Sequence, residues 1–145
     1  DHDRPLNKRG LRNAPEMGFR LAKRDWLPNL FLASTAKRAR DTAALIAGKV
    51  AYTEGRIMFD DRLYLAQHGE WRSIIGALPA EAAHVACIGH NPGITELANH
   101  FSGEYIHNVP TCGLIDMRFE VDAWANVFEA KPASFEFDFP KNTQP

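Results

Sequence analysis

The chain has 145 residues and a net charge of -1, with 45% hydrophobic and 24% charged residues, which is the composition of one globular domain with a full core. This balance argues against a disordered chain and against a surface built mainly for nucleic acid or anionic lipid. The longest apolar runs are a few residues, far below the roughly 20 that span a bilayer. Cys87 and Cys112 offer neither a disulfide framework nor metal-ligand spacing, so we expect a cytoplasmic protein.

The first thirty residues predict a helix followed by a buried strand. Asn7 can cap a helix whose apolar stripe extends to Trp26, and Pro15 makes it either one kinked helix or two short pieces. Residues 30–33 form a brief apolar run between polar neighbours. Such a run is typical of a strand covered on both faces.

A second helix and two short strands are expected next. Ser34 or Thr35 can cap the helix, and Gly48 ends it. Residues 50–52 and 57–59 have the composition of short strand pieces that lead into a loop.

The second half of the chain predicts two more helices around a buried strand, and then a different pattern. Residues 70–78 favour a short helix, and 84–88 form a second buried-strand run. Pro92 is expected to be the first residue of a helix that ends at Gly103.

The last third of the chain predicts a pair of strands. Residues 114–121 and 134–139 alternate or run apolar without a long helix between them, which suits neighbouring strands at one side of a sheet. The order of elements therefore predicts an α/β layer fold with a mostly parallel sheet, without internal repeats or linkers.

Two junctions between a strand and a helix are candidate sites, because ligands of open α/β sheets bind beyond the carboxyl ends of the strands. Arg38 is expected in the opening turn of the second helix, where its guanidinium can offer a bidentate fork to a phosphate. His90 lies in the turn after 84–88, next to the dipole of the following helix. The alternative interpretation of Arg38 is a solvated surface arginine, and that of His90 is a structural histidine. The other histidines are expected to be structural or superficial: His2, His68, His84, His100 and His107.

Taken together, several short motifs resemble one family over nearly the whole chain. They are Asp-Arg-Pro-Leu-Asn at 3–7 with the residues to Gly10, S-x-x-x-R-A-x-x-T at 34–42, Leu-Tyr at 63–64, Gly-His-Asn-Pro-Gly at 89–93, Pro-Thr at 110–111 and Phe-Pro-Lys at 139–141. In this combination and order, the chain resembles the SixA-type branch of the histidine phosphatase (phosphoglycerate mutase-like) superfamily.

The resemblance implies a three-layer α/β/α domain in which a histidine carries the phosphoryl group as a covalent intermediate that water hydrolyses. In the family, this nucleophile follows an arginine at the end of the first strand. No Arg-His pair occurs in the sequence, and His2 is no substitute because neither an apolar strand nor an arginine precedes it. We therefore expect residues 1–145 to be a single histidine phosphatase domain without its first strand, and an upstream segment to carry the nucleophile.

The matching residues take their expected roles from the resemblance. Arg38 corresponds to a phosphate-binding arginine that stabilises charge on the transferring group. His90 corresponds to the second histidine, which donates a hydrogen bond to the phosphate. Arg4 resembles the additional basic residue of SixA-type sites. Asn91 and Thr111 border the pocket without a chemical step.

A general acid is not recognisable from the sequence. Relatives that hydrolyse alkyl phosphates place a carboxylate near the middle of the chain, and residues 60–70 lack that pattern. A protonated phosphoimidazole leaves as neutral imidazole, whose conjugate acid has a pKa of about 6.5, so a phosphohistidine substrate tolerates this gap. The remaining candidate proton donors are Asp60, Asp61, His68 and Glu70.

Three functions stay open at this point. The favoured one is a phosphohistidine phosphatase acting on a phosphorylated protein, such as a histidine phosphotransfer domain. The alternatives are a small-molecule phosphomonoesterase of the same superfamily and a non-catalytic phosphate-binding module. We expect no cofactor and no metal, because the sequence lacks clustered metal ligands and a P-loop. We expect neither nucleic acid nor membrane as a partner, because the net charge is near neutral and the apolar runs are short.

Overall fold

The computed structural model describes residues 1–142. Its helices and strands follow one another along the chain as α1 (Lys8–Ala22), β1 (Leu30–Ala33), α2 (Lys37–Lys49), β2 (Met58–Phe59), α3 (His68–Gly76), β3 (Val85–Ile88), α4 (Gly93–Ser102), β4 (Leu114–Arg118) and β5 (Ser134–Asp138). Three short 3-10 helices connect them: η1 (Glu54–Arg56), η2 (Asp61–Leu63) and η3 (Trp124–Glu129). None of the helices formed by residues 1–142 has the length and apolar character needed to cross a bilayer.

The strands form a parallel group and an antiparallel pair. β1 lies between β2 and β3 and is parallel to both, pairing with β3 from Leu30–Val85 to Ala33–Ile88. β4 and β5 are neighbours, as their sequence pattern predicted, and they form an antiparallel two-stranded sheet of their own. Within residues 1–142, no ladder of hydrogen bonds joins β3 to β4.

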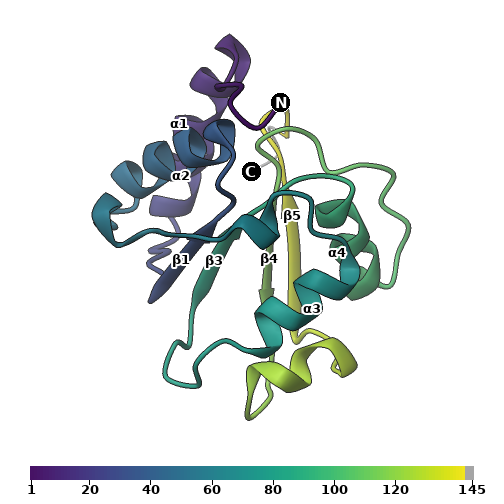
Figure 1. Ribbon diagram of the computed structural model, residues 1–145. Helices are drawn as coiled ribbons and strands as arrows, with labels where there is room; N and C mark the ends of the chain where they lie inside the picture. The colour runs from purple at the N-terminus through teal and green to yellow at the C-terminus, as the bar shows by residue number, and fades with distance from the viewer. Residues whose placement is uncertain (143–145) are drawn as a thin grey trace.

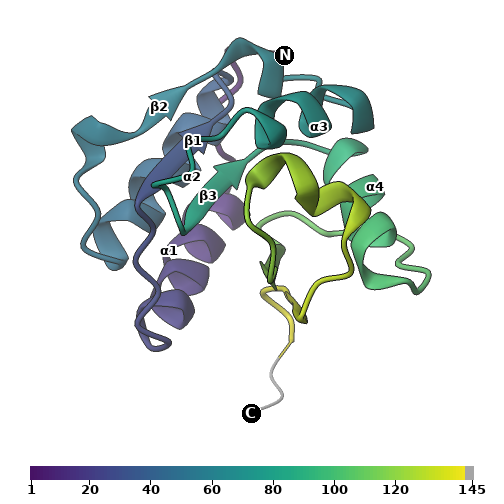
Figure 2. The same cartoon turned by 90° about the horizontal axis from the view of Figure 1, so that it is seen from below.

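Helices cover both faces of the parallel strands (Figure 1). Phe31 packs toward α1 and α2 in one apolar cluster, whereas the next residue, Leu32, belongs to a second cluster with α3, α4 and η3. This alternation is the period-two pattern of a strand buried on both sides. In Figure 2, η3 lies in yellow-green beside α3 and α4. The mixed α/β fold with a mostly parallel sheet is therefore confirmed.

A close approach joins the two helices of the first layer. A Cβ atom on Gly18 of α1 would lie 3.0 Å from Cβ of Lys49 and 3.2 Å from Cα of Ile46 in α2. The glycine therefore lets the helix axes come together over the cluster around Phe31.

A cleft separates β3 from β4. It is a largely apolar cavity of about 570 Å³ whose walls include Val85–Ile88 on one side and residues 114–117 on the other. Because β3 pairs with β1 and β4 with β5 on their other edges, each wall presents a strand edge that no ladder in the described part of the chain satisfies. We call this cavity the β3–β4 cleft; Arg38 and His90 also line it.

Several local predictions are confirmed. Asn7 caps α1, its Oδ1 accepting from the backbone N–H of Gly10 at 2.8 Å. α1 is one continuous helix through Pro15, which decides between the two readings of that segment. Gly103 ends α4 with a φ of 71°, a conformation that favours glycine.

Other local predictions are wrong. α2 begins after Ala36 and has no side-chain cap, because the hydroxyl groups of Ser34 and Thr35 bind elsewhere. Residues 50–52 form no strand; they close α2 and turn the chain instead. Pro92 is the N-cap of α4 and not its first residue.

Candidate active site

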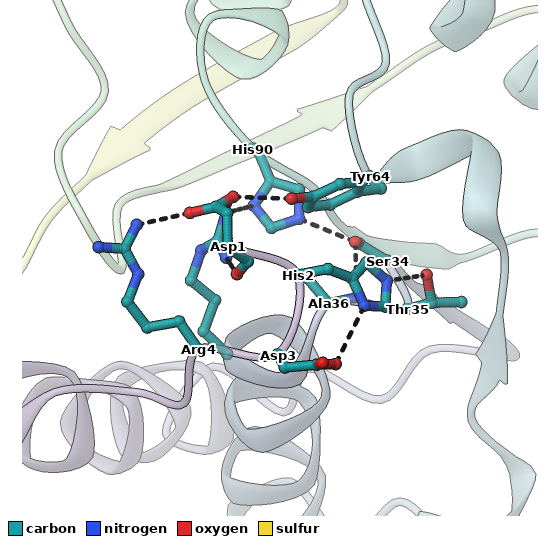
Figure 3. Close-up of polar contacts among 10 residues, drawn as sticks. Asp1, His2, Asp3, Arg4, Ser34, Thr35, Ala36, Tyr64 and His90 are labelled. Atoms are coloured by element: carbon teal, nitrogen blue, oxygen red, sulfur yellow. Dashed lines mark hydrogen bonds and ion pairs between the residues drawn. The ribbon is translucent and has the colours of Figure 1, made fainter.

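Two strand ends meet at the candidate site. Ser34 follows β1 and His90 follows β3, and because these strands are parallel neighbours their carboxyl ends lie side by side. Figure 3 shows both side chains together with the start of the chain and Tyr64. The two junctions that the sequence singled out therefore form one site.

The innermost contact of the site joins His90 to Ser34. Nε2 of His90 lies 2.8 Å from Oγ of Ser34, which is fully buried and also accepts from the backbone N–H of Ala36 at 3.2 Å. On the other side of the ring, a guanidinium nitrogen of Arg38 lies 3.5 Å from Nδ1. The imidazole is thus held by one neighbour on each nitrogen.

The surroundings of His90 favour its neutral form. Burial, then the nearby charges of Arg38 and His2, lowers the pKa of His90 to about 4. A guanidinium can only donate, so Nδ1 accepts from Arg38, and Nε2 carries the proton that it donates to Ser34. The ring is therefore a neutral imidazole near pH 7 whose one N–H is already used.

An anion-binding pocket lies in front of this histidine. The carboxylate of Asp1 accepts from Arg4 at 2.6 Å, from the hydroxyl of Tyr64 at 2.7 Å and from Arg38 at 3.4 Å, and its backbone oxygen accepts from Arg38 at 3.0 Å. Two guanidinium groups and a phenol thus converge on one carboxylate, which stands in for an anionic ligand of similar acceptor geometry. We call Arg4, Arg38 and Tyr64 around this carboxylate the anion pocket.

A second polar chain borders the pocket. The hydroxyl of Thr35 donates to Oδ1 of Asp61 at 2.6 Å and lies 2.8 Å from Nε2 of His2. Because the single hydroxyl proton goes to Asp61, Nε2 of His2 is the donor in the other contact. The ring of His2 also meets Tyr64 edge-on, with centroids 4.7 Å apart. His2, which was expected to be structural or superficial, therefore borders the site.

Tight packing fixes the turn that holds His90. A Cβ on Gly89 would lie 2.5 Å from the ring of Trp71, and one on Gly93 would lie 2.2 Å from the carbonyl oxygen of Ala66. The two glycines thus let the turn lie flat against α3 and the loop before it.

Asn91 braces the same turn. Its side-chain amide donates to the carbonyl of Val109 at 2.7 Å, and its Oδ1 accepts from the N–H of Thr95 in the first turn of α4 at 3.1 Å. Thr111, further along the braced segment, lines the β3–β4 cleft together with Asn91.

The candidate proton donors differ in the residues that they contact. Asp60 is held by Arg62, whose hydrogen bond lowers the pKa of the carboxyl group. His68 stacks near His100, with ring centroids 5.0 Å apart, on the side of α3 and α4. Among these candidates, only Asp61 is linked by hydrogen bonds to residues of the site, through Thr35.

Neither thiol has the character of a nucleophile. Burial raises the pKa of Cys87 to about 12 and also raises that of Cys112. Since the thiolate is the reactive form, both side chains stay protonated at neutral pH. Cys87 packs with the cluster of Leu32, as expected of a residue of the core.

The fold and the site define a class of protein. An α/β/α layer structure carries an arginine and a histidine at adjacent strand ends, and the arginine contacts both the histidine and a carboxylate. The family model described as histidine phosphatase superfamily (branch 1) matches residues 1–109. The chain belongs to the histidine phosphatase superfamily.

Individual relatives agree with this assignment. An uncharacterized chloroplastic protein of Arabidopsis thaliana is 31% identical over 136 residues, which is 88% of this chain and 62% of that protein, so the chain spans less than two thirds of this relative's length. The putative phosphohistidine phosphatase SixA of Agrobacterium tumefaciens is 27% identical with a TM-score of 0.74, over 94% of this chain and 84% of that one.

Two further solved structures show the same fold. The putative phosphohistidine phosphatase SixA of Nakamurella multipartitia has a TM-score of 0.75 at 24% identity, over 97% of this chain and 87% of that one. The protein histidine phosphatase SixA complexed with tungstate has a TM-score of 0.81 at 20% identity, over 99% of this chain and 89% of that one. The resemblance read from the motifs is therefore confirmed.

The sequence missed three members of the site. Ser34 was one of two candidate helix caps, Tyr64 had no assigned role, and His2 was expected to be structural or superficial. For Ser34, its position between a buried strand and a helix was a usable signal, because such junctions face the ligand side of a sheet. Tyr64 and His2 reach the site through loop contacts that no local pattern encodes.

Proposed function

We propose that the protein is a phosphohistidine phosphatase that removes phosphate from a phosphoprotein through a covalent phosphohistidine intermediate. The observation that carries the proposal is the anion pocket, where Arg4, Arg38 and Tyr64 hold the Asp1 carboxylate beside His90. A phosphoryl group has more acceptor oxygens and more charge than a carboxylate, so these donors suit it better.

We further propose that the nucleophilic imidazole comes from a strand that precedes Asp1 and fills the β3–β4 cleft. Two strand edges without ladder partners in residues 1–142 support an added strand there. A strand parallel to β3 ends at the same edge as His90 and delivers its last residues beside Asp1. Such a strand both completes the sheet and brings a side chain to the anion pocket.

The proposed reaction is two successive transfers at phosphorus. An imidazole nitrogen attacks the phosphorus of the substrate while the P–N bond to the substrate imidazole breaks, and that imidazole leaves with the electron pair. Water then attacks the phosphorus of the phosphoenzyme, and the P–N bond breaks with its electron pair returning to the enzyme imidazole. One proton of the water is lost to the imidazole or the solvent, and inorganic phosphate is released. Arg4 and Arg38 offset the negative charge of the oxygens in both steps.

His90 has a specific part in this proposal. Its Nδ1 accepts from Arg38 when the ring is neutral, so it can donate to a phosphoryl oxygen only after gaining a proton. A phosphoryl dianion beside the ring favours that proton, because an opposite charge raises the pKa of a histidine. Phosphate binding is therefore coupled to proton uptake.

A second candidate function has one observation in its favour. Asp61 is tied to the site through Thr35, next to the Nε2–H of His2. This arrangement could supply a proton to an alkoxide leaving group, as a small-molecule phosphomonoesterase requires. The non-catalytic module and the cytoplasmic location both stay predictions from the sequence.

Rapid-quench trapping in alkaline detergent with the full-length protein tests the proposal. We expect labelled phosphate from a phosphohistidine peptide to remain on the protein as an acid-labile, base-stable adduct, and to be lost from Arg38→Ala. Asp61→Asn distinguishes the two functions: it should leave turnover of the phosphohistidine peptide within about twofold, whereas an alkyl phosphatase would lose its activity. Absence of any adduct together with normal turnover would refute the covalent mechanism, and phosphate binding without turnover would support the non-catalytic module.

A further inference from the structure

The start of α1 carries a concentration of positive charge. Lys8, Arg9 and Arg12 are all exposed, and the first turn of the helix contains no acidic residue. The N-terminus of a helix has a partial positive charge, so cations there are unfavourable. Lys8 and Arg12 are also four residues apart, the spacing at which like charges on a helix repel each other. We call these three residues the basic face.

Nothing in the described part of the chain neutralises the basic face. None of its three side chains takes part in an ion pair within residues 1–142. The acidic residue best placed to pair with Arg12 is Glu16, four positions later, but Glu16 pairs with Arg20 at 2.9 Å. The basic face therefore lowers stability without a compensating contact.

The basic face adjoins the anion pocket. α1 begins four residues after Arg4, which binds the Asp1 carboxylate, and Figure 1 shows the first turn of α1 close to the N-terminus. Arg9 lies near enough to Cys112, a residue that lines the β3–β4 cleft, for its charge to oppose the rise in the pKa of that thiol. The positive charge of the pocket thus continues outward along the helix.

We propose that the basic face is a docking surface for acidic residues that flank the phosphorylated residue of a protein substrate. The proposal rests on the proposed phosphatase function and adds the kind of partner that it takes. Charge complementarity supports it, since three cations without an ion pair in residues 1–142 begin four residues after Arg4, which binds the anion of the pocket. From Lys8 to Arg12 the helix rises about 6 Å, which matches about two residues of an extended peptide.

The test uses the full-length protein and two phosphohistidine peptides that differ only in their flanks, glutamate in one and glutamine in the other. The variant K8Q/R9Q/R12Q removes the basic face. Its matched control, K23Q/R56Q/K131Q, removes the same charge from exposed sites at the far end of α1, beyond the far end of α2 and before β5. p-Nitrophenyl phosphate serves as a substrate without flanks.

We expect K8Q/R9Q/R12Q to lower kcat/KM for the glutamate peptide about tenfold, through KM, and to flatten its dependence on salt. The glutamine peptide and p-nitrophenyl phosphate should change less than about twofold, and the control variant should behave as the parent. The same variant should unfold at a slightly higher temperature, because it removes unfavourable charges from the helix N-terminus.

Two results would overturn the docking surface: equal kcat/KM for the two peptides in the parent protein, or an equal effect of the two triple variants on the glutamate peptide. If no substrate is turned over, the proposed function fails first. Fluorescence anisotropy of a labelled, unphosphorylated glutamate peptide then decides the docking surface alone, since it should bind the parent at least about fivefold more tightly than K8Q/R9Q/R12Q. Equal binding would refute it.

Discussion

The two junctions that build the site are made in opposite ways. Where β1 meets α2, polar groups dominate: the helix has no side-chain cap, Ser34 and Thr35 bind other parts of the site, and Arg38 extends from the first turn. Where β3 meets α4, packing dominates, with Gly89 and Gly93 pressed against neighbouring groups.

This difference gives the two junctions different roles: one supplies positive charge and the other fixes the position of a side chain. The β1–α2 junction supplies the cation that binds an anion, whereas the β3–α4 junction holds an uncharged ring in a fixed place. A site that transfers a phosphoryl group needs both, because charge stabilises the moving group and a fixed ring aligns it. Changes at the two junctions should therefore be distinguishable.

The largest effect is expected from Arg38→Ala. Losing the guanidinium that contacts the anion should lower phosphatase kcat about a thousandfold, on the scale of removing one preorganised donor to the transition state. The melting temperature should change little, because the side chain is partly exposed and contributes charge more than packing. Steady-state kinetics with the full-length protein measures the loss, and near-normal turnover would remove Arg38 from the site.

At the other junction, Gly93→Ala should act on stability. The new Cβ would lie 2.2 Å from the carbonyl oxygen of Ala66, so the turn must move at a cost of about 3 kcal/mol in the free energy of unfolding. Urea denaturation measures this cost. Gly48→Ala is the control, since its Cβ would meet nothing within 4 Å, and it should be neutral or stabilising.

Ser34→Ala joins the two junctions and should be intermediate. It removes the partner of both the Nε2–H of His90 and the backbone N–H of Ala36, at a cost of about 2 kcal/mol in unfolding free energy. Replacing the exposed Ser73 of α3 by alanine serves as control, and chemical denaturation compares the two. Equal stability of both variants would show that the buried hydroxyl contributes nothing.

The smallest effect is the pH dependence that His90 gives to folding. Its pKa is about 4 in the folded protein and about 6.5 when unfolded, so only the unfolded state binds a proton between these values. Stability should therefore rise with pH across this window, by about 1 to 2 kcal/mol after screening at a half-exposed ring. Urea titrations at pH 4.5, 5.5 and 7 should show a flatter profile for His90→Gln; an unchanged profile would contradict the neutral ring.

The layers could be predicted from the sequence because buried strands and helices have recognisable apolar patterns within short segments. The apolar runs 30–33 and 84–88 are typical of strands covered on both faces, and their parallel pairing brings Arg38 and His90 to one edge. The motifs around these residues then indicated the family. The spacing of the apolar residues and the turn residues were thus enough to predict the fold and the place of the candidate site.

The details of the site depended on contacts that no local pattern reports. A serine before a helix is normally read as a cap, yet Ser34 binds a histidine 56 residues away. The proton on Nε2 of that histidine follows from an arginine on another element. The same limit applies to residues 50–52, whose strand-like composition closes α2 and pairs with no strand in the described chain.

The β3–β4 cleft also bears on the order in which the protein assembles. Its two walls are about thirty residues apart in the chain, and a strand preceding Asp1 would contact both only after most of the chain has emerged from the ribosome. Contacts between distant segments form slowly, because loop closure must come first. In the proposed arrangement, the step that closes the sheet also delivers the nucleophile, so chains that have not finished folding are catalytically silent.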